Sequence, residues 1–417
     1  MPLFPKIEKI TRDASIIHFF LMFGYKSFSL YFPLFLIARG LSLPEVGYSY
    51  LLIYLPLSLF APIAGFLNHK INPAMLSGVG ILGYAVYALG MILIQNPVLF
   101  YFWQVLLGIS AALFFVSIRA ILMGYHLENP DRSFGWFYSA PFYADAVAPA
   151  VGAFFIWKFD FAGVFIFSLI LHLFTAVFCF VKLKKIAKPL LVEEDKSSSS
   201  PFANVRVGDG FNLKDSQDNY KKIFQVLKTK TILPFLLISF SVLLLAGFYR
   251  AFFVLFLKDQ LVWSQDLILI FISVFSVLFV PLSLLLIKHL EKNNSEKNVF
   301  QGSLVAGFFS IIFGLALPVL SFLNVLLINI ARSAGSLICN SARSGLISKR
   351  LKTEPEEASV IDTIFAPLGV AFGALISGLV IGFLGYQMLF IFAGIFVIIV
   401  GLLGKMASQS SHYRFHN

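Results

Sequence analysis

Three ionisable side chains lie near the middle of long apolar stretches of this sequence. Lys26, Asp145 and Arg332 are each about ten to twelve residues inside such a stretch, which is ~15–18 Å along a helix. A charge at that depth in a bilayer costs ~2.5–3.5 kcal/mol or more, so such residues are rare and commonly functional. For Lys26 and Arg332, the chemistry is either a clamp for an anion or polyol, or a structural contact that locks helices together.

Asp145 also has two interpretations. It is either the structural partner of Lys26, which has a similar calculated depth, or a proton acceptor in coupled transport. Two opposite charges brought within ~4 Å of each other in a low-dielectric site keep each other ionised, so a paired Asp145 would be hard to protonate. An anion that competes for Lys26 would then free the carboxylate to take up a proton.

Both cations belong to polar stripes with helical spacing. Ser29 follows Lys26 by three residues and shares its helix face, while the neighbouring Tyr25 can either pack or stack on a substrate. Arg250 is a further candidate for substrate binding, although like Arg119 and Arg343 it lies nearer a helix end, where snorkelling explains a charge. A longer stripe, which should face water or a partner helix, consists of Asn329, Arg332, Ser336, Asn340 and Arg343.

Motifs that would indicate an enzyme are missing from the sequence. There is no phosphate-cradling loop, no H-E-x-x-H pattern and no serine nucleophile elbow. Cys179 and Cys339 are the two cysteines, and their separation fits neither a metal site nor a disulfide framework. We therefore expect no enzyme activity, no cofactor and no metal, and any uphill transport would have to use an ion gradient.

The elements that must hold these residues are membrane-spanning helices. The 417 residues are 59% hydrophobic and only 13% charged, whereas soluble domains carry about 25% charged residues. Runs of about 20 apolar residues match the bilayer thickness, and open strands cannot span lipid. The sequence predicts an all-α membrane protein with twelve spans: 14–37, 44–66, 74–95, 98–124, 134–157, 162–182, 231–257, 265–288, 298–318, 323–346, 357–381 and 386–404.

The distribution of basic residues predicts the orientation. With the N-terminus in the cytoplasm, 24 Lys and Arg residues fall on the inner side and 3 on the outer side. Both termini should therefore be cytoplasmic, and the net charge of +11 reflects topology and contact with anionic lipids, not nucleic acid. The polar stretch 183–230 reads as a cytoplasmic linker between the halves 1–182 and 231–417, the second of which ends in a short cytoplasmic tail.

The two halves resemble each other in sequence. At a shift of 221 residues, 31–36 (YFPLFL) falls on 252–257 (FFVLFL), and 148–153 (APAVGA) falls on 369–374 (GVAFGA). Arg119 and Arg343 correspond at a shift of 224. Several matches at nearly one offset favour a duplication into two six-helix repeats around a central cavity, an architecture typical of transporters.

Three short motifs resemble those of the major facilitator superfamily. The segment 65–72 (GFLNHKIN) is similar to the family signature after the second helix, with Gly65, His69 and Lys70 at its gating positions. The segments 104–112 (QVLLGISAA) and 148–153 (APAVGA) are similar to the family's patterns in the fourth and fifth helices. The resemblance implies that helices 1, 4, 7 and 10 line a central cavity, which would place Lys26 and Arg332 there.

We expect a secondary transporter that works by alternating access. A small polar or anionic solute would bind near mid-membrane, H⁺ would be the coupling ion, and Asp145 would carry it. The protein is expected to be a monomer in a cell inner membrane, with membrane lipids as its other partners. The alternatives are a receptor or scaffold on the same fold, which would have no central cavity, and an exporter of drugs or lipids.

Overall fold

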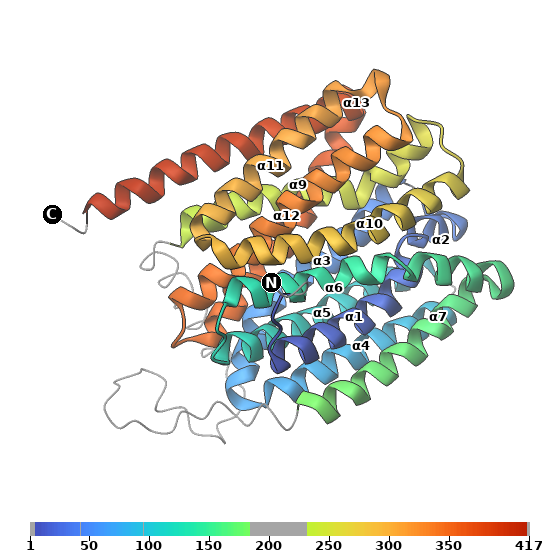
Figure 1. The fold of residues 1–417 in the computed structure, drawn as a ribbon. Helices are drawn as coiled ribbons and strands as arrows, with labels where there is room; N and C mark the ends of the chain where they lie inside the picture. Colours follow the sequence, from blue (N-terminus) through green and yellow to red (C-terminus); the bar gives the residue numbers. More distant parts are fainter. Residues whose placement is uncertain (1–4, 42, 95, 184–231, 415–417) are drawn as a thin grey trace.

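The computed structural model describes residues 5–41, 43–94, 96–183 and 232–414, and the regular elements in these ranges are all helical. Figure 1 shows two bundles side by side, one blue to green and one yellow to red. The predicted linker 183–230 lies outside the described residues except for Leu183.

The first bundle contains α1 (Lys9–Ser29), α2 (Phe32–Ala38), α3 (Leu43–Lys70), α4 (Pro73–Leu93), α5 (Pro97–Gly124), α6 (Pro130–Asp145) and α7 (Ala148–Leu183). The second contains α9 (Leu233–Asp259), α10 (Gln265–Lys292), α11 (Ser295–Leu315), the short 3₁₀ helix η1 (Leu317–Val319), α12 (Phe322–Arg350) and α13 (Pro355–Arg414).

The chain is an integral membrane protein. Within the described residues, nine helical stretches are long and apolar enough to cross a membrane. Two of these, Pro130–Leu183 and Pro355–Ser408, are 54 residues long, more than twice the ~20 residues that one span requires. The pairs of runs expected to be separate in these regions, 134–157 with 162–182 and 357–381 with 386–404, are therefore joined almost without a loop.

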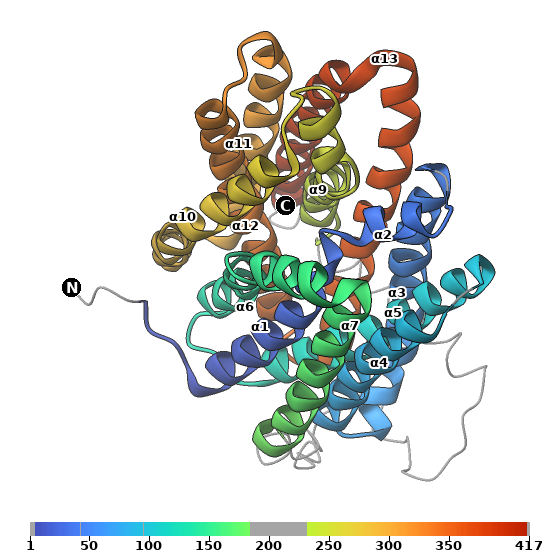
Figure 2. The same ribbon diagram turned by 90° about the vertical axis from the view of Figure 1, so that its right-hand side faces the viewer.

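Each of the two long stretches folds back at a single point of non-helical backbone. In α7 the break is at Phe159 and Asp160, and Asp160 has φ 56° and ψ −170°. In α13 the break is at Gly385, with φ 75° and ψ 174°. The halves thus make the same tight turn with nearly the same backbone conformation, which only glycine adopts readily. The fold-back of α13 is visible in Figure 2.

Prolines interrupt the two helices that carry Lys26 and Asp145. Pro33 has no N–H group to bond the carbonyl of Ser29, four residues earlier, and α1 ends at Ser29. Pro149 stands in the same relation to Asp145, where α6 ends. Each interruption lies within one turn of one member of the expected ion pair.

The interrupted helices are held together by a close backbone approach. A Cβ atom on Gly152 would lie 1.7 Å from the carbonyl oxygen of Ser27, so only glycine fits there. The Tyr31 hydroxyl donates a hydrogen bond of 2.8 Å to the Pro149 carbonyl beside this contact. In the second half, a Cβ atom on Gly373 would meet the Leu244 carbonyl at 2.1 Å. Small residues thus let membrane helices pack closely at corresponding places in both halves.

The two bundles meet at four pairs of helices. Helix α6 packs on α10 and α12, and α13 packs on α3 and α5. We call the end of the molecule with the segments 71–72, 125–129, 293–294 and 351–354 the basic-loop face. Near this face the apolar core of the first half continues into the second, because Ile347, Leu351 and Val360 belong to the same buried cluster. The bundles are therefore in contact at the basic-loop face.

Candidate functional site

Lys26 and Asp145 form an ion pair, as the sequence predicted. Lys26 Nζ lies 3.0 Å from a carboxylate oxygen of Asp145, and the two side chains are 27% and 23% exposed. The lysine comes from the last turn of α1 and the aspartate from the last residue of α6. The pair thus sits at the proline interruptions, partly exposed and therefore open to a competing ion.

Arg250 of α9 connects the second half to this region. Its guanidinium donates a hydrogen bond of 3.0 Å to the hydroxyl of Tyr54 on α3 and also interacts electrostatically with Asp145. Tyr25 packs edge-on against Tyr84, with 6.1 Å between the ring centroids. The candidate site therefore combines charged groups with a tyrosine-rich wall contributed by the first half.

Arg332 contacts a different set of residues from those expected. Its guanidinium carbon lies 3.5 Å from the ring centroid of Tyr249, and it donates a hydrogen bond of 3.2 Å to Ser333. Its Nε atom is buried without a hydrogen-bond partner, and no carboxylate within the described residues forms an ion pair with it. Arg332 is thus a cation held by an aromatic ring, with at least one donor still to be satisfied.

Only part of the polar stripe of α12 is accessible as predicted. Ser336 and Asn340 are half-buried and hydrogen-bonded to each other at 3.3 Å. Asn329, in contrast, is only 3% exposed and donates to the Val325 carbonyl of its own helix. The expectation that Asn329 faces a water-filled cleft is not met in this conformation, because its amide is occupied within α12. Ser29 is half-buried at the end of α1.

A second charged group, missed by sequence reasoning, lies at the boundary between the halves. Asp362 of α13 is 0% exposed and accepts hydrogen bonds from Arg343 (2.9 Å), Ser344 (2.7 Å) and Tyr138 (3.0 Å). Arg119 of α5 lies 3.4 Å from the same carboxylate. We call these five residues the Asp362 cluster. It joins α5 and α6 of the first half to α12 and α13 of the second.

The Asp362 cluster corrects the interpretation of two arginines. Arg119 and Arg343 were explained by snorkelling to the interface, but they are 6% and 1% exposed and are paired with a buried carboxylate. The cluster also follows the repeat, because Arg119 and Arg343 are 224 residues apart, as are Tyr138 and Asp362. Two repeat-related pairs therefore converge on one point between the halves. The sequence does contain a signal for this cluster. Asp362 is an acid inside the apolar run 357–381, and Tyr138 is its counterpart in the first repeat.

Further ion pairs cross between the halves at the basic-loop face. Lys349 lies 2.9 Å from Asp131, and Arg132 lies 2.9 Å from Glu291. At the exposed edge, hydrogen bonds from Lys6 and Arg132 hold the pKa of Glu128 below its usual value. Together with the Asp362 cluster, these contacts close the basic-loop face.

The residues of the family-like segment at the C-terminal end of α3 lie at the same boundary. His69 Nε2 is 3.8 Å from a carboxylate oxygen of Glu357 on α13. A Cβ atom on Gly65 would lie 2.1 Å from the side chain of Val360, so α3 and α13 pack closely here. Lys70 lies over the Phe66 ring at 4.9 Å. The segment predicted to control gating is therefore in contact with the opposite half.

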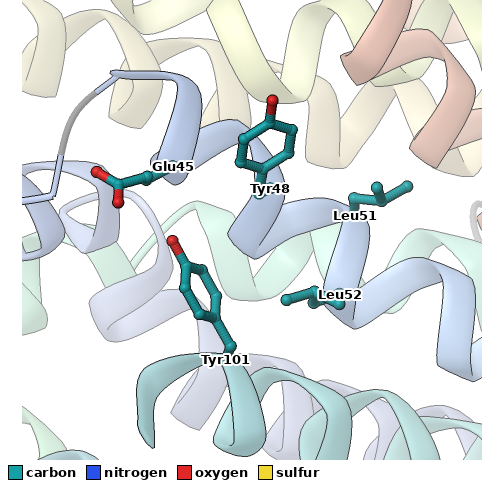
Figure 3. Close-up of a pocket in the computed structure, with 5 residues that line it drawn as sticks. All are labelled: Glu45, Tyr48, Leu51, Leu52 and Tyr101. Carbon is teal, nitrogen blue, oxygen red and sulfur yellow. The ribbon is translucent and has the colours of Figure 1, made fainter. Parts of the chain in front are cut away.

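An apolar pocket of about 460 Å³ lies at the other end of the molecule from the basic-loop face. It is lined by Glu45, Tyr48, Leu51, Leu52 and Tyr101, from the N-terminal parts of α3 and α5. The hydroxyl of Tyr101 points toward the Glu45 carboxylate (Figure 3). The residues predicted to bind substrate are not among those that line this pocket.

Comparisons with known proteins give one family and one fold. The family model described as Major Facilitator Superfamily matches residues 14–359. The chain is 24% identical over 375 residues to "Multidrug resistance protein 2" of Bacillus subtilis (strain 168), which covers 89% of this chain and 88% of the relative. Its fold is similar to that of the human organic anion transporter MFSD10 (TETRAN), with a TM-score of 0.73, 14% identity, and coverage of 95% of this chain and 100% of that chain.

Proposed function

This chain is a member of the major facilitator superfamily, whose model matches residues 14–359, and we propose that this secondary transporter carries a small organic anion together with a proton. The observation that carries the proposal is the Lys26–Asp145 pair, which is 3.0 Å long and partly exposed. Because the pair is partly exposed, a ligand can reach it and draw the two charges apart.

Charge balance supports an anionic substrate. The candidate residues include three cations, Lys26, Arg250 and Arg332, but only one acid, Asp145. Arg250 is exposed, and Arg332 has a buried N–H donor without a partner. Both can therefore donate hydrogen bonds to a carboxylate or phosphate group. The tyrosines beside them offer a surface for the apolar part of the same molecule.

Competition for Lys26 supports proton coupling. While Lys26 neutralises Asp145, protonation of the carboxylate is unfavourable. An anion that draws Lys26 away leaves a carboxylate in a low-dielectric site, where it is stabilised by taking up a proton. Anion and proton would then favour each other's binding, which is the thermodynamic requirement for symport.

The finer architecture is part of the same proposal. We propose twelve spans in two six-helix repeats, 1–182 and 231–417, joined by 183–230 and moving by alternating access around a central cavity. Both termini would face the cytoplasm, and the monomer in a cell inner membrane would be the working unit. The ion pairs at the basic-loop face support a state that is closed toward the cytoplasm, with the substrate admitted from the other side.

Asp145→Asn tests the coupling directly. The variant should still exchange anions between the two sides of proteoliposomes, because the cations that bind the substrate remain. It should no longer accumulate the anion against its gradient when a pH difference is imposed, because the residue that takes up the proton is gone. The measurement is radiolabelled uptake for a panel of organic anions, with and without the pH difference.

Lys26→Ala and Arg332→Ala provide the contrast. Each should weaken anion binding itself, because each variant lacks one of the cations that would pair with the anion. Tyr101→Phe in the separate pocket serves as the control and should leave uptake unchanged. Uphill accumulation by Asp145→Asn equal to that of the unmodified protein would refute the assigned role of Asp145.

Export of lipophilic drugs is the second candidate function. It is supported by the similarity to a relative named "Multidrug resistance protein 2" and by the tyrosine-rich wall around Tyr25 and Tyr54. The excess of cations makes the site suited to drugs with an acidic group and unfavourable for cationic ones. Protection of cells by the expressed protein against lipophilic drugs with an acidic group, without uphill anion uptake driven by a pH difference, would favour this candidate over the anion symporter.

A further inference from the structure

The basic-loop face holds a group of side chains that the transport proposal does not use. His69 lies in the last turn of α3, and Glu356 and Glu357 lie in the first turn of α13. One ligand atom from each of the three residues lies within 4.8 Å of the other two. An imidazole from one half thus faces two carboxylates from the other half, and the His69 and Glu357 side chains are only 24% and 3% exposed.

We propose that His69, Glu356 and Glu357 bind a divalent transition-metal ion that links the two halves of the protein. Ligand atoms at ~2.0–2.2 Å from one Zn²⁺ lie ~3–4 Å apart, so only small side-chain rotations are needed to complete the site. A neutral imidazole and two carboxylates carry two negative charges, which balance the charge of the ion. This set suits Zn²⁺, Co²⁺ or Mn²⁺, whereas Ca²⁺ and Mg²⁺ prefer oxygen ligands alone.

Close packing of the two helices keeps the ligands in place. A Cβ atom on Gly65, one turn before His69, would meet the Val360 side chain at 2.1 Å and the Glu356 carbonyl at 3.9 Å. The backbones of α3 and α13 are therefore in contact beside the proposed site.

The repeat suggests what the ion does. Arg132 precedes Glu356 by 224 residues, the offset that relates the arginines of the Asp362 cluster. In the α6–α10 contact, Arg132 forms an ion pair of 2.9 Å with Glu291. In the corresponding α13–α3 contact, the histidine and Glu357 are 3.8 Å apart. A bound metal would make the second contact as strong as the first.

Metal binding should therefore stabilise the closed basic-loop face. The three ligands come together only when α3 and α13 are in contact, so the ion binds this state selectively and shifts the equilibrium toward it. Transport that requires this face to open would slow down. Only this inhibitory effect rests on the proposed function, since metal binding itself does not depend on any substrate.

Co²⁺ titration of the full-length protein in detergent, purified on a tag without histidines, tests the site. We expect one Co²⁺ per chain, with visible absorption bands typical of nitrogen and oxygen ligands. His69→Ala and Glu356→Gln should each weaken Co²⁺ binding strongly. The loss of a residue that only supports a metal ligand typically weakens binding by ~10–100-fold, and the loss of a ligand itself should weaken it more. His126→Ala, an exposed histidine on the same face, is the matched control and should bind as the unmodified protein does. Absence of binding, or equal binding by His69→Ala, would overturn the proposal.

Spin labels at Tyr125 and Lys352, exposed on the two halves of the basic-loop face, provide a second measurement. Zn²⁺ should narrow the distribution of distances between the labels toward its short end, and His69→Ala should abolish this effect. The result does not depend on transport and reports only on folded protein. Co²⁺ binding without any change in the distances would overturn the link between the halves.

Discussion

Asp362 neutralises two arginines that come from different halves of the protein. Its carboxylate is completely buried, and Arg343 and Arg119 lie 2.9 and 3.4 Å away from it. Pairs of this kind gain little net stability over apolar packing, but removing one partner leaves an uncompensated charge and costs ~3–5 kcal/mol. The part of this cost that comes from Arg119 falls on the closed state, because Arg119 belongs to the other half and would leave the cluster when the face opens.

Asp362→Asn should therefore open the basic-loop face. Ser58, which is 3% exposed and donates to the Ile364 carbonyl across the boundary, marks this opening. A cysteine at Ser58, with Cys179 and Cys339 replaced by alanine, should react faster with a polar thiol reagent when Asp362→Asn is present. Thr363→Val, which removes only one neutral partner of Arg119, is the control and should have a much smaller effect. Unchanged reactivity in Asp362→Asn would show that the cluster does not hold the face closed.

Contacts of individual residues were predictable where depth in the membrane and the family resemblance agreed. The pairing of Lys26 with Asp145 followed from their similar depth and from that resemblance, and the structure confirms the contact. The burial of Arg119 and Arg343 could not be predicted in the same way. It depends on α5 and α12 meeting at Asp362, which is a property of how the halves dock and not of any one helix.

At the scale of elements, the turns in α7 and α13 are equivalent in shape but differ in residue type. Asp160 adopts φ 56° and ψ −170°, while Gly385 adopts φ 75° and ψ 174°. Residues other than glycine are strained by about 1–3 kcal/mol at these φ and ψ values. The first half therefore retains strain that the second half avoids.

Substitutions at the two turns should change stability in opposite directions. Asp160→Gly should raise the free energy of unfolding and Gly385→Ala should lower it, each by about 1–3 kcal/mol. Gly382→Ala is the matched control, because a Cβ atom at Gly382 or Gly385 meets nothing within 4 Å and only Gly385 has a positive φ. Thermal unfolding in detergent measures the effect. A decrease in Asp160→Gly would mean that the aspartate side chain contributes more than the backbone strain removes.

Helix boundaries were predicted well where apolar runs ended in polar residues and less well where prolines or tight turns decided them. The runs 74–95 and 98–124 agree closely with α4 and α5. The run 14–37 is interrupted in the structure because Pro33 deprives Ser29 of its helical hydrogen bond. Two expected loops are single turns, since apolar composition alone does not show how few residues a reversal needs.

At the scale of the whole molecule, charge and closure coincide. Among the described residues, Arg132, Lys349 and Arg350, which the charge count assigns to the inner side, lie at the end of the bundle where the halves are in contact. Arg132 and Lys349 also supply partners for Glu291 and Asp131 across the boundary. The predicted orientation therefore implies access to the candidate site from the outer side in this state.

Side-specific labelling should show this access. A cysteine at Ser336 in sealed vesicles of known orientation should react with an impermeant thiol reagent supplied from the side opposite the basic-loop face. The same reagent supplied from the basic-loop side should react slowly, because the ion pairs exclude it. Leu337, which is 2% exposed on the adjacent position of α12, is the control and should be unreactive from both sides. Equal labelling of Ser336 from both sides would contradict a face closed by these contacts.

The fold-back turns have a consequence for how the protein responds to its lipid. Trp157 and Phe383, just before the turns of α7 and α13, are 81% and 86% exposed, and Lys158 lies over the rings of Phe154 and Phe159. Tryptophan and basic side chains settle at the level of the lipid headgroups, whereas phenylalanine has no polar group that would hold it there. The first half thus carries an anchor beside its turn. Tilting this half against the other would move the anchor away from that level, so bilayer thickness becomes a variable that sets the balance between conformations.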